Sequence, residues 1–316
     1  ERSSVSAHYN AGLAFDYFKN THNRNSLNGS GGRIISVVNV ADKDGSSLEN
    51  AYWNGQAMFY GNGGNVFKPL AGALDVAGHE LTHGVVSNSA NLEYQGQSGA
   101  INESMADVFG AMIDRDDWKM GEDVVKSGIF AGGALRNLQD PHNGTTNGNN
   151  GYQPAQMSEY YTGTQDNGGV HINSGIVNRA YYLAATASGM SKNKAEKIWY
   201  RALTVYLTSR SQFLDLRYAC VDAANDLYST SESDAVKAAF DQVQIYDPNG
   251  GNGGGGDDDN ELPTNSGSEF IISVDVDIFN STTLYKSTPT PNNFVGLSQN
   301  TPKRKCSVTD DGKYLY

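Results

Sequence analysis

The chain is poor in charge and in cysteine, and it lacks long apolar runs. Only 18% of its 316 residues are Asp, Glu, Lys or Arg, and two are cysteines, Cys220 and Cys306. No run of about 18 apolar residues occurs, so we expect no membrane-spanning helix. Cys220 lies in a helical pattern and Cys306 in a distant tail, and two separate thiols explain them as well as a disulfide does.

Basic residues are also scarce. The chain has 23 Lys and Arg against 35 Asp and Glu, which gives a formal net charge of −12. This charge repels nucleic acids and anionic membranes, so we expect neither as a partner. Glycine, tyrosine and asparagine are abundant instead, with 36 Gly and 18 Tyr. Such a composition is typical of an exported protein, and we expect a secreted, monomeric one.

Hydrophobic periodicity divides the chain into a mixed front section and a mainly helical body. Residues 5–19 have an amphipathic helical pattern, whereas 33–40 and 50–61 are β-branched or aromatic runs bounded by turn residues, as strands are. We therefore predict an α+β fold with a β-rich N-terminal lobe over 1–72 and a helical lobe over 73–246. An irregular region is expected over 120–168, and the helices of the second lobe are predicted over 73–87, 99–114, 170–188, 193–208, 211–228 and 231–243.

The composition changes after residue 246. Residues 247–268 are rich in Gly and Asp, and we predict a flexible linker there. In the tail, 269–316, the run 269–279 alternates apolar and acidic residues as one half-buried strand does. So short a piece cannot form a core of its own, so we expect the tail to be either disordered or a truncated extra module.

The strongest chemical signal is LDVAGHELTHGVV, residues 74–86. His79 and His83 are four residues apart, and Glu80 directly follows the first. On a helix this spacing puts both imidazoles on one face, where they can bind one metal ion. A buried apolar stripe runs along the opposite edge of the same helix, so an accidental surface cluster is disfavoured. We therefore predict a zinc site.

Zinc needs a third protein ligand, and the spacing leaves two candidates, Glu93 and Glu103. Glu103 lies on the next predicted helix, which could pack antiparallel beside the first and present it to the metal. Asp107 follows one turn later, where it could accept a hydrogen bond from a zinc-bound histidine. For Glu93, the role of a solvated loop charge is favoured.

Three stretches in this order resemble the thermolysin-like zinc neutral metalloproteases, which are gluzincins, and especially their vibriolysin-type secreted bacterial members. The stretches are HELTH, AINESMADVFG and YTGTQDNGGVHINSGIVNRAYYL, and the resemblance extends from about residue 7 to 246. It implies a β-rich front lobe and a helical rear lobe, with the active-site helix in the cleft between them. It also implies that Glu103 is the third zinc ligand and that Asp107 is the partner of His79.

The resemblance assigns further catalytic roles that the residues alone leave open. It implies that His171 stabilises the transition state and that Asp166 orients it. From the pattern alone, His142 would be an equally good candidate for this histidine. The resemblance also makes Tyr94 a donor to the oxyanion, where a packing role would otherwise be favoured.

A substrate cleft is implied in the same way. Asn50, Ala51 and Trp53 resemble an edge strand that pairs with an extended substrate backbone. Arg136 matches an arginine that bonds a substrate carbonyl. The implied apolar pocket for the residue after the cut is formed by Phe67, Leu70, Val76, Val124 and Leu135.

Calcium is expected behind the active-site helix. The carboxylates that match the family's ligands are those of Asp75, Asp114, Asp117 and Glu122, and their alternative role is that of a solvated acidic cluster. Lys119 stands where relatives with a paired calcium site carry an acid. We therefore expect one structural calcium, with the Lys119 carbonyl as a further candidate ligand.

These assignments predict a secreted zinc metalloendopeptidase that prefers a hydrophobic residue on the carboxyl side of the cut. Glu80 would act as general base toward a zinc-activated water. Two alternatives stay open. One is a catalytically impaired remnant, because the chain begins at what resembles the family's first long helix, so the N-terminal lobe is expected to be truncated. The other is a related zinc aminopeptidase, for which Glu93 would be the candidate anchor.

Overall fold

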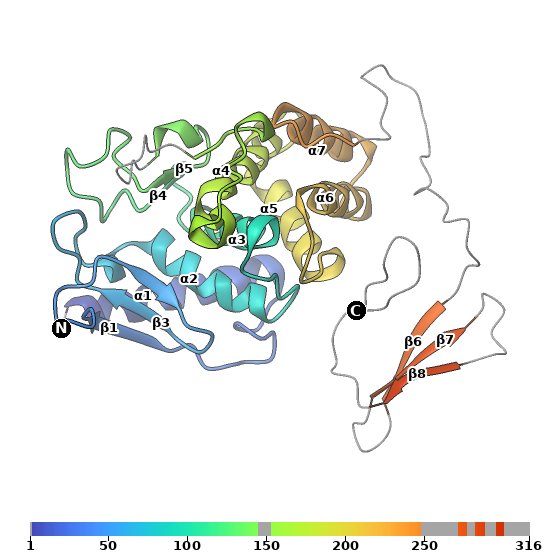
Figure 1. The fold of residues 1–316 in the computed structure, drawn as a ribbon, viewed down its shortest axis with the longest axis horizontal. Coiled ribbons are helices and arrows are strands. Elements are labelled where there is room, and N and C mark those ends of the chain that lie inside the picture. Colours follow the sequence, from blue (N-terminus) through green and yellow to red (C-terminus); the bar gives the residue numbers. More distant parts are fainter. Residues whose placement is uncertain (1, 145–152, 248–270, 277–281, 288–294, 300–316) are drawn as a thin grey trace. The chain divides into compact units, whose positions relative to one another are not determined.

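The structure is a computed structural model that describes residues 2–144 and 153–247, and the tail segments 271–276, 282–287 and 295–299. The chain divides into two units, residues 1–250 and 251–316, and each is described by itself (Figure 1). None of the described helices is long and apolar enough to span a membrane.

The front of the first unit combines one long helix with a small sheet. Its sheet has the strand order β1-β3-β2, in which β1 is parallel and β2 antiparallel to the central strand β3. Two strands replace the single predicted run 50–61, because the Asn54 side chain accepts hydrogen bonds from the amides of Gln56 and Ala57, both at 2.9 Å, and forms a turn. The elements are α1 (Arg2–His22), β1 (Ser36–Val40), β2 (Ala51–Trp53), β3 (Met58–Gly61) and the 3-10 helix η1 (Leu70–Gly72).

The rest of the first unit is mainly helical, so the α+β prediction is confirmed. The predicted helix over 193–208 is α-helical only to Arg201 and continues as a short π-helix. Its helices are α2 (Leu74–Ser87), α3 (Gly96–Ile113), α4 (Gln165–Thr186), α5 (Lys192–Arg201), the π-helix η4 (Ala202–Tyr206), α6 (Phe213–Leu227) and α7 (Thr230–Gln242). The region between α3 and α4 contains β4 (Lys119–Met120), β5 (Arg136–Asn137), η2 (Pro141–Asn143) and η3 (Met157–Glu159).

Helices α2 and α3 lie side by side at the centre of this unit (Figure 1). Glycines face each other where they touch: a Cβ added to Gly78 would lie 3.2 Å from the Gly110 Cα. A Cβ on Gly110 would in turn lie 2.8 Å from the Asp75 carbonyl oxygen. This close approach brings the polar side chains of both helices together.

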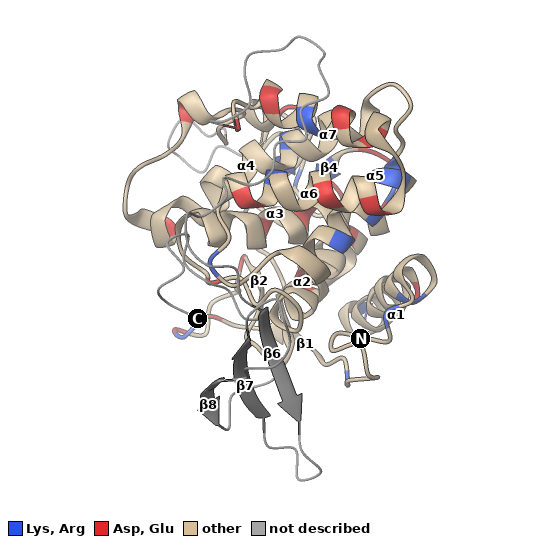
Figure 2. Cartoon of the chain, turned by 90° about the vertical axis from the view of Figure 1, so that its right-hand side faces the viewer, with Lys and Arg blue, Asp and Glu red and all other residues tan. Residues whose placement is uncertain are grey.

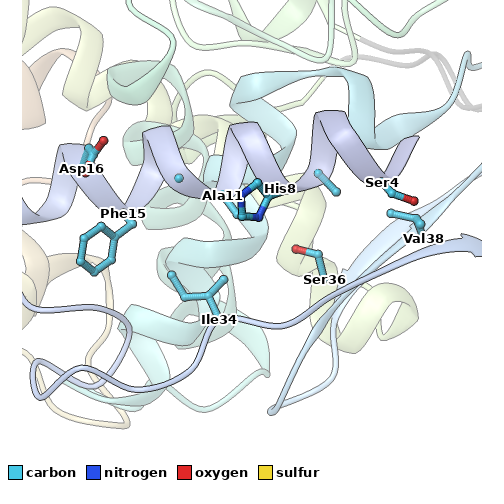
Figure 3. A pocket seen from close by; sticks show the side chains of 10 residues that line it. Ser4, His8, Ala11, Phe15, Asp16, Ile34, Ser36 and Val38 are labelled. Carbon is cyan, nitrogen blue, oxygen red and sulfur yellow. The ribbon is translucent and has the colours of Figure 1, made fainter. Parts of the chain in front are cut away.

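The helices of the first unit carry charges of both signs, and a cavity lies at α1. Figure 2 shows acidic and basic residues interspersed along α5, α6 and α7. The cavity, of about 480 Å³, lies between α1 and residues 34–38 (Figure 3), and none of the predicted site residues lines it.

In the second unit, the tail contains a three-stranded antiparallel sheet of order β6-β7-β8. Its strands are β6 (Ile271–Val276), β7 (Thr282–Ser287) and β8 (Val295–Gln299). The strand predicted over 269–279 corresponds to β6. Cys306 and most of the predicted linker lie outside the described residues, and Cys220 is a buried free thiol.

Candidate active site

The two histidines of α2 point their Nε2 atoms at one another, 3.0 Å apart. Glu103 reaches them from α3: its Oε2 lies 3.5 Å from His79 Nε2, and its Oε1 lies 3.4 Å from His83 Nε2. Among the described residues, this is the one group of His, Cys, Asp and Glu that brings three ligand atoms within 4.8 Å of one another.

The hydrogen bonds around these histidines show that the trio fits a metal ion. His79 Nδ1 lies 2.8 Å from Asp107 Oδ1, and His83 Nδ1 lies 2.9 Å from Asn102 Oδ1. The Asn102 amide nitrogen donates to the Leu92 carbonyl at 3.2 Å, so its oxygen faces the imidazole. Both oxygens only accept, so each Nδ1 carries the proton and each Nε2 presents a lone pair. Glu103 Oε2 is buried with no hydrogen-bond partner, so three electron donors face a common centre, as zinc requires.

Asp107 is fully buried, at 0% exposure, and its carboxylate receives donors from three other elements. Besides His79, Arg136 donates from Nε to Oδ2 at 2.8 Å and from Nη2 to Oδ1 at 2.7 Å. Asn178 of α4 donates to Oδ2 at 2.8 Å. Burial alone would raise the pKa of Asp107, but the Arg136 guanidinium and His79 outweigh it and hold that pKa well below its usual value.

Glu80 lies in the same buried environment. Only 5% of it is exposed, and its Oε2 has no hydrogen-bond partner among the described residues. Burial raises its pKa to about 7, although the nearby His83 opposes that shift. A buried carboxylate without a partner beside a metal site is suited to exchange a proton with a bound molecule.

His171 and Tyr94 approach the trio from the other side. The Tyr94 hydroxyl lies 3.1 Å from His171 Nε2 and also donates to Glu103 Oε1, which is 3.5 Å from the same imidazole nitrogen. Asp166 Oδ1 lies 2.7 Å from His171 Nδ1. Burial would lower the pKa of His171, but Glu103 and Asp166 outweigh it and raise that pKa.

An unusual turn aims Asp166 at His171. Residues 166–169, the sequence DNGG, have φ values of 54°, 50°, 80° and 80°, in the left-handed region that Asp, Asn and Gly tolerate. Right-handed helix begins only after it, and Asp166 Oδ2 accepts the His171 backbone N–H at 2.8 Å. A Cβ on Gly169 would lie 2.6 Å from Tyr161 Cδ1, so this position has no room for a side chain.

The predicted substrate residues come from β2, from the segment that leads into the start of α2, and from the region between α3 and α4. Strand β2, with Ala51 and Trp53, is an edge strand, and the carbonyl of Asn50 accepts the Gly61 N–H at 3.0 Å. Of the five predicted pocket residues, Leu70, Val76 and Val124 are buried in one cluster, Phe67 packs against it, and Leu135 is half-buried beside Gly121.

The predicted calcium ligands form a second acidic cluster. Asp75, 1% exposed, accepts the Val76 N–H at 2.7 Å and also the Gly121 N–H. Burial raises the pKa of Asp75 to about 7, with Asp114 adding to the shift. Burial and then Asp75 raise the pKa of Glu122 to about 7.

The members of this second cluster interact without converging. Asp117 accepts the Lys119 N–H at 2.7 Å. Within the described ranges, no three residues of the cluster bring carboxylate oxygens as close together as the ligand atoms of His79, His83 and Glu103. Asp123, which the sequence reasoning did not include, also raises the pKa of Asp75.

The alternative candidates lie elsewhere. Glu93 Oε1 lies 2.8 Å from Arg210 Nε at the surface, and the His142 imidazole lies 2.8 Å from Glu159. Neither belongs to the zinc trio. The sequence reasoning missed Asn102 and Asn178, because an asparagine in a helix carries no sign of what it faces.

Comparisons with known proteins show the family to which the chain belongs. Residues 1–87 match the family model described as thermolysin metallopeptidase, catalytic domain, and residues 90–245 match its alpha-helical domain. Thermolysin of Alicyclobacillus acidocaldarius is 47% identical over 262 residues, which are 78% of this chain and 46% of that protein. Neutral protease B of Bacillus subtilis is 46% identical, over 78% of this chain and 45% of that protein.

Among solved structures, the precursor of protealysin, a metalloproteinase from Serratia proteamaculans, matches with a TM-score of 0.72 and 36% identity. That match covers 78% of this chain and 79% of the other. The chain spans about half the length of the curated relatives it matches.

Proposed function

Because this chain belongs to the thermolysin metallopeptidase family, we propose that it is a zinc-dependent endopeptidase. The observation that carries the proposal is the convergence of His79 Nε2, His83 Nε2 and Glu103. We propose these three as the zinc ligands, with Asp107 orienting His79. A zinc ion held there supplies Lewis-acid polarisation of the scissile carbonyl and of water.

Side chains of the protein carry out proton transfer and stabilise the oxyanion. Glu80, unpartnered and buried, accepts the proton of the attacking water and transfers it to the leaving amine. The His171 imidazole and the Tyr94 hydroxyl, 3.1 Å apart, donate hydrogen bonds to the oxyanion that develops on the substrate. Asp166 holds the His171 ring in the orientation this requires.

The substrate is a protein or peptide bound in extended form. The open edge of β2 at Asn50, Ala51 and Trp53 is suited to pair with its backbone. The Arg136 bonds to Asp107 use Nε and Nη2, and we assign Nη1 to a substrate carbonyl. The apolar group of Phe67, Leu70, Val76, Val124 and Leu135 selects a hydrophobic residue just after the cut.

We further propose one structural calcium, held by Asp75, Asp114, Asp117 and Glu122 with the Lys119 carbonyl. The raised pKa values of Asp75 and Glu122 support a cation there, because buried carboxylates that repel one another are stabilised by positive charge. The protein would act outside the cell as a monomer. It would consist of a front lobe (1–72), a catalytic lobe (73–246), a linker (247–268) and a tail module (269–316).

The test uses the full chain, loaded with zinc, and end-blocked peptides with Leu or Phe after the target bond. We expect cleavage that is lost on chelation and in Glu80→Gln. Glu93→Gln is the matched control and retains activity, since its ion pair with Arg210 lies outside the trio. Inertness of the folded, zinc-loaded protein would favour the impaired remnant. Trimming of free amino termini alone would favour an aminopeptidase.

A further inference from the structure

One carboxylate outside the trio is held by three consecutive backbone amides. Glu49 Oε1 accepts the N–H of Asn65 at 2.6 Å, and its Oε2 accepts those of Val66 at 2.8 Å and Phe67 at 3.0 Å. Glu49 comes just before the edge strand, and the amides follow the sheet, so this contact joins the two ends of the β2–β3 hairpin.

Gly63 and Gly64, which precede these three amides, allow the Glu49 carboxylate to come this close to the backbone. A Cβ on Gly64 would lie 2.7 Å from Glu49 Oε1, and Gly63 has a φ of +69°. The neighbours of Glu49 also bond the loop, because the Leu48 carbonyl accepts the Gly63 N–H at 3.1 Å. Residues 48–50 and 61–67 are therefore fixed to each other by side-chain and backbone bonds together.

The segment 63–67 continues into residues of the proposed apolar pocket. Phe67 forms a β-bridge with Val125, and the Lys68 N–H donates to the Val124 carbonyl at 2.8 Å. The Lys126 N–H donates to the Val66 carbonyl at 3.0 Å. Glu49 thus bonds directly to the segment 65–67. This segment pairs with residues 124–126, which include Val124 of the proposed pocket, and it contributes Phe67 to the same pocket.

Resting on the proposed function, we propose that Glu49 is a positioning residue for specificity. It holds Phe67 and the start of the edge strand in register, and thereby sets the preference for a large apolar residue after the cut. A carboxylate suits this task because both of its oxygens accept hydrogen bonds, whereas a glutamine would turn an NH₂ group toward amide donors.

The test compares the full chain, loaded with zinc and calcium, with E49Q and with D44N as matched control. Asp44 is an exposed carboxylate of the same front section that accepts one backbone N–H, from Ser46 at 2.8 Å. Kinetics are measured on two end-blocked peptides that differ only in Leu or Ala after the cut. We expect the Leu/Ala ratio of kcat/KM to fall roughly 10-fold in E49Q, since a misshapen apolar pocket loses discrimination of about that size. The ratio should not change in D44N.

A purely structural role would lower kcat/KM equally for both peptides, and that result overturns the proposal. If E49Q does not fold, Gly64→Ala, which crowds the same carboxylate, should lower the same ratio, and an unchanged ratio overturns the proposal.

Amide hydrogen exchange gives a readout independent of activity. The amides of Asn65, Val66 and Phe67 should exchange faster in E49Q than in the wild type, and retained protection overturns the proposal. Should the wild type cleave neither peptide, the proposed function fails, while the exchange result still decides whether Glu49 holds this turn.

Discussion

The molecule has two carboxylate clusters, one at Glu103 and Asp107 and the other at Asp75 and Glu122, and they are built in opposite ways. In the first, the proposed zinc site, Glu103 and Asp107 are surrounded by imidazoles, a guanidinium and amide donors. Burial would raise both pKa values, yet His83 and its neighbours lower that of Glu103 to about 2. In the Asp75 cluster, burial and then the neighbouring carboxylates raise the pKa values of Asp75 and Glu122 to about 7.

This contrast shows which of the two sites is organised by the protein's own side chains. The proposed zinc ligands are held by protein partners that need no ion, so their geometry is set before a metal binds. Among the described residues, no Lys or Arg forms an ion pair with Asp75 or Glu122, so we expect the ionised form of this cluster to depend on a bound cation. The first site is therefore expected to fail when a protein partner is removed, and the second when the cation is removed.

Substitution of Asp107, to which His79, Arg136 and Asn178 all bond, should reduce stability and zinc affinity more than any other change proposed for these sites. In Asp107→Asn, the buried Arg136 loses its counter-charge, and we expect the free energy of unfolding to fall by about 3–5 kcal/mol. Zinc affinity should also fall by roughly 10- to 100-fold, since His79 loses its orienting acceptor. Denaturant unfolding and competition with a chromogenic chelator measure the two. Unchanged zinc affinity in the folded variant would contradict the role of Asp107.

The second cluster should respond to pH and calcium instead. Burial raises the pKa of Asp75 in the folded protein to about 7, from its ordinary value of 3.8. Its contribution to stability is thus fully present below about pH 4 and is lost as pH rises to about 7. The loss is on the order of 4 kcal/mol without a cation.

Calcium should cancel this loss. Melting temperatures at constant zinc, with and without calcium, should diverge as pH rises from 5 to 8. Two curves that stay parallel would show that no cation binds at Asp75.

The contrast between the clusters also marks how far sequence reasoning reaches. His79 and His83 are predictable because helical periodicity alone puts them on one face, and the same period sets Glu103 and Asp107 one turn apart. The helical pattern already favoured Glu103 over Glu93, and the family resemblance implied that Glu103 is the third ligand. The structure adds a reason, because Glu93 pairs with Arg210 at the surface.

Contacts between segments that are distant in the sequence could not be predicted from the sequence. Asn178 lies 71 residues from Asp107 in sequence, and the parallel pairing of β1 with β3 has no local signature. The left-handed turn of residues 166–169 is made of Asp, Asn and Gly, which indicate a loop but not its direction. By contrast, Asn54-Gly55 is a recognised turn signal, and it could have divided the predicted strand 50–61.

A smaller effect is expected from the turn that serves the first cluster. Gly169→Ala and Gly189→Ala both place a side chain at a φ near +80°, so each should lose about 1–2 kcal/mol of stability. Only Gly169 has close neighbours, Tyr161 and Asn173. We therefore expect kcat to fall in Gly169→Ala alone, with the calcium dependence of its melting temperature unchanged. Equal kcat values in both variants would show that the turn does not position Asp166 and His171.

The smallest effect should come from a carboxylate that belongs to neither cluster. Glu93 is half-exposed and its partner Arg210 is more so, with their side chains 48% and 68% exposed. Water and salt screen such a pair, so Glu93→Gln should change stability by less than about 1 kcal/mol. Its zinc affinity and its response to calcium should equal those of the wild type. A shift in zinc affinity or in the response to calcium would contradict the division into two independently organised clusters. Loss of one negative charge outside both clusters would then be enough to produce the effects expected of the other variants.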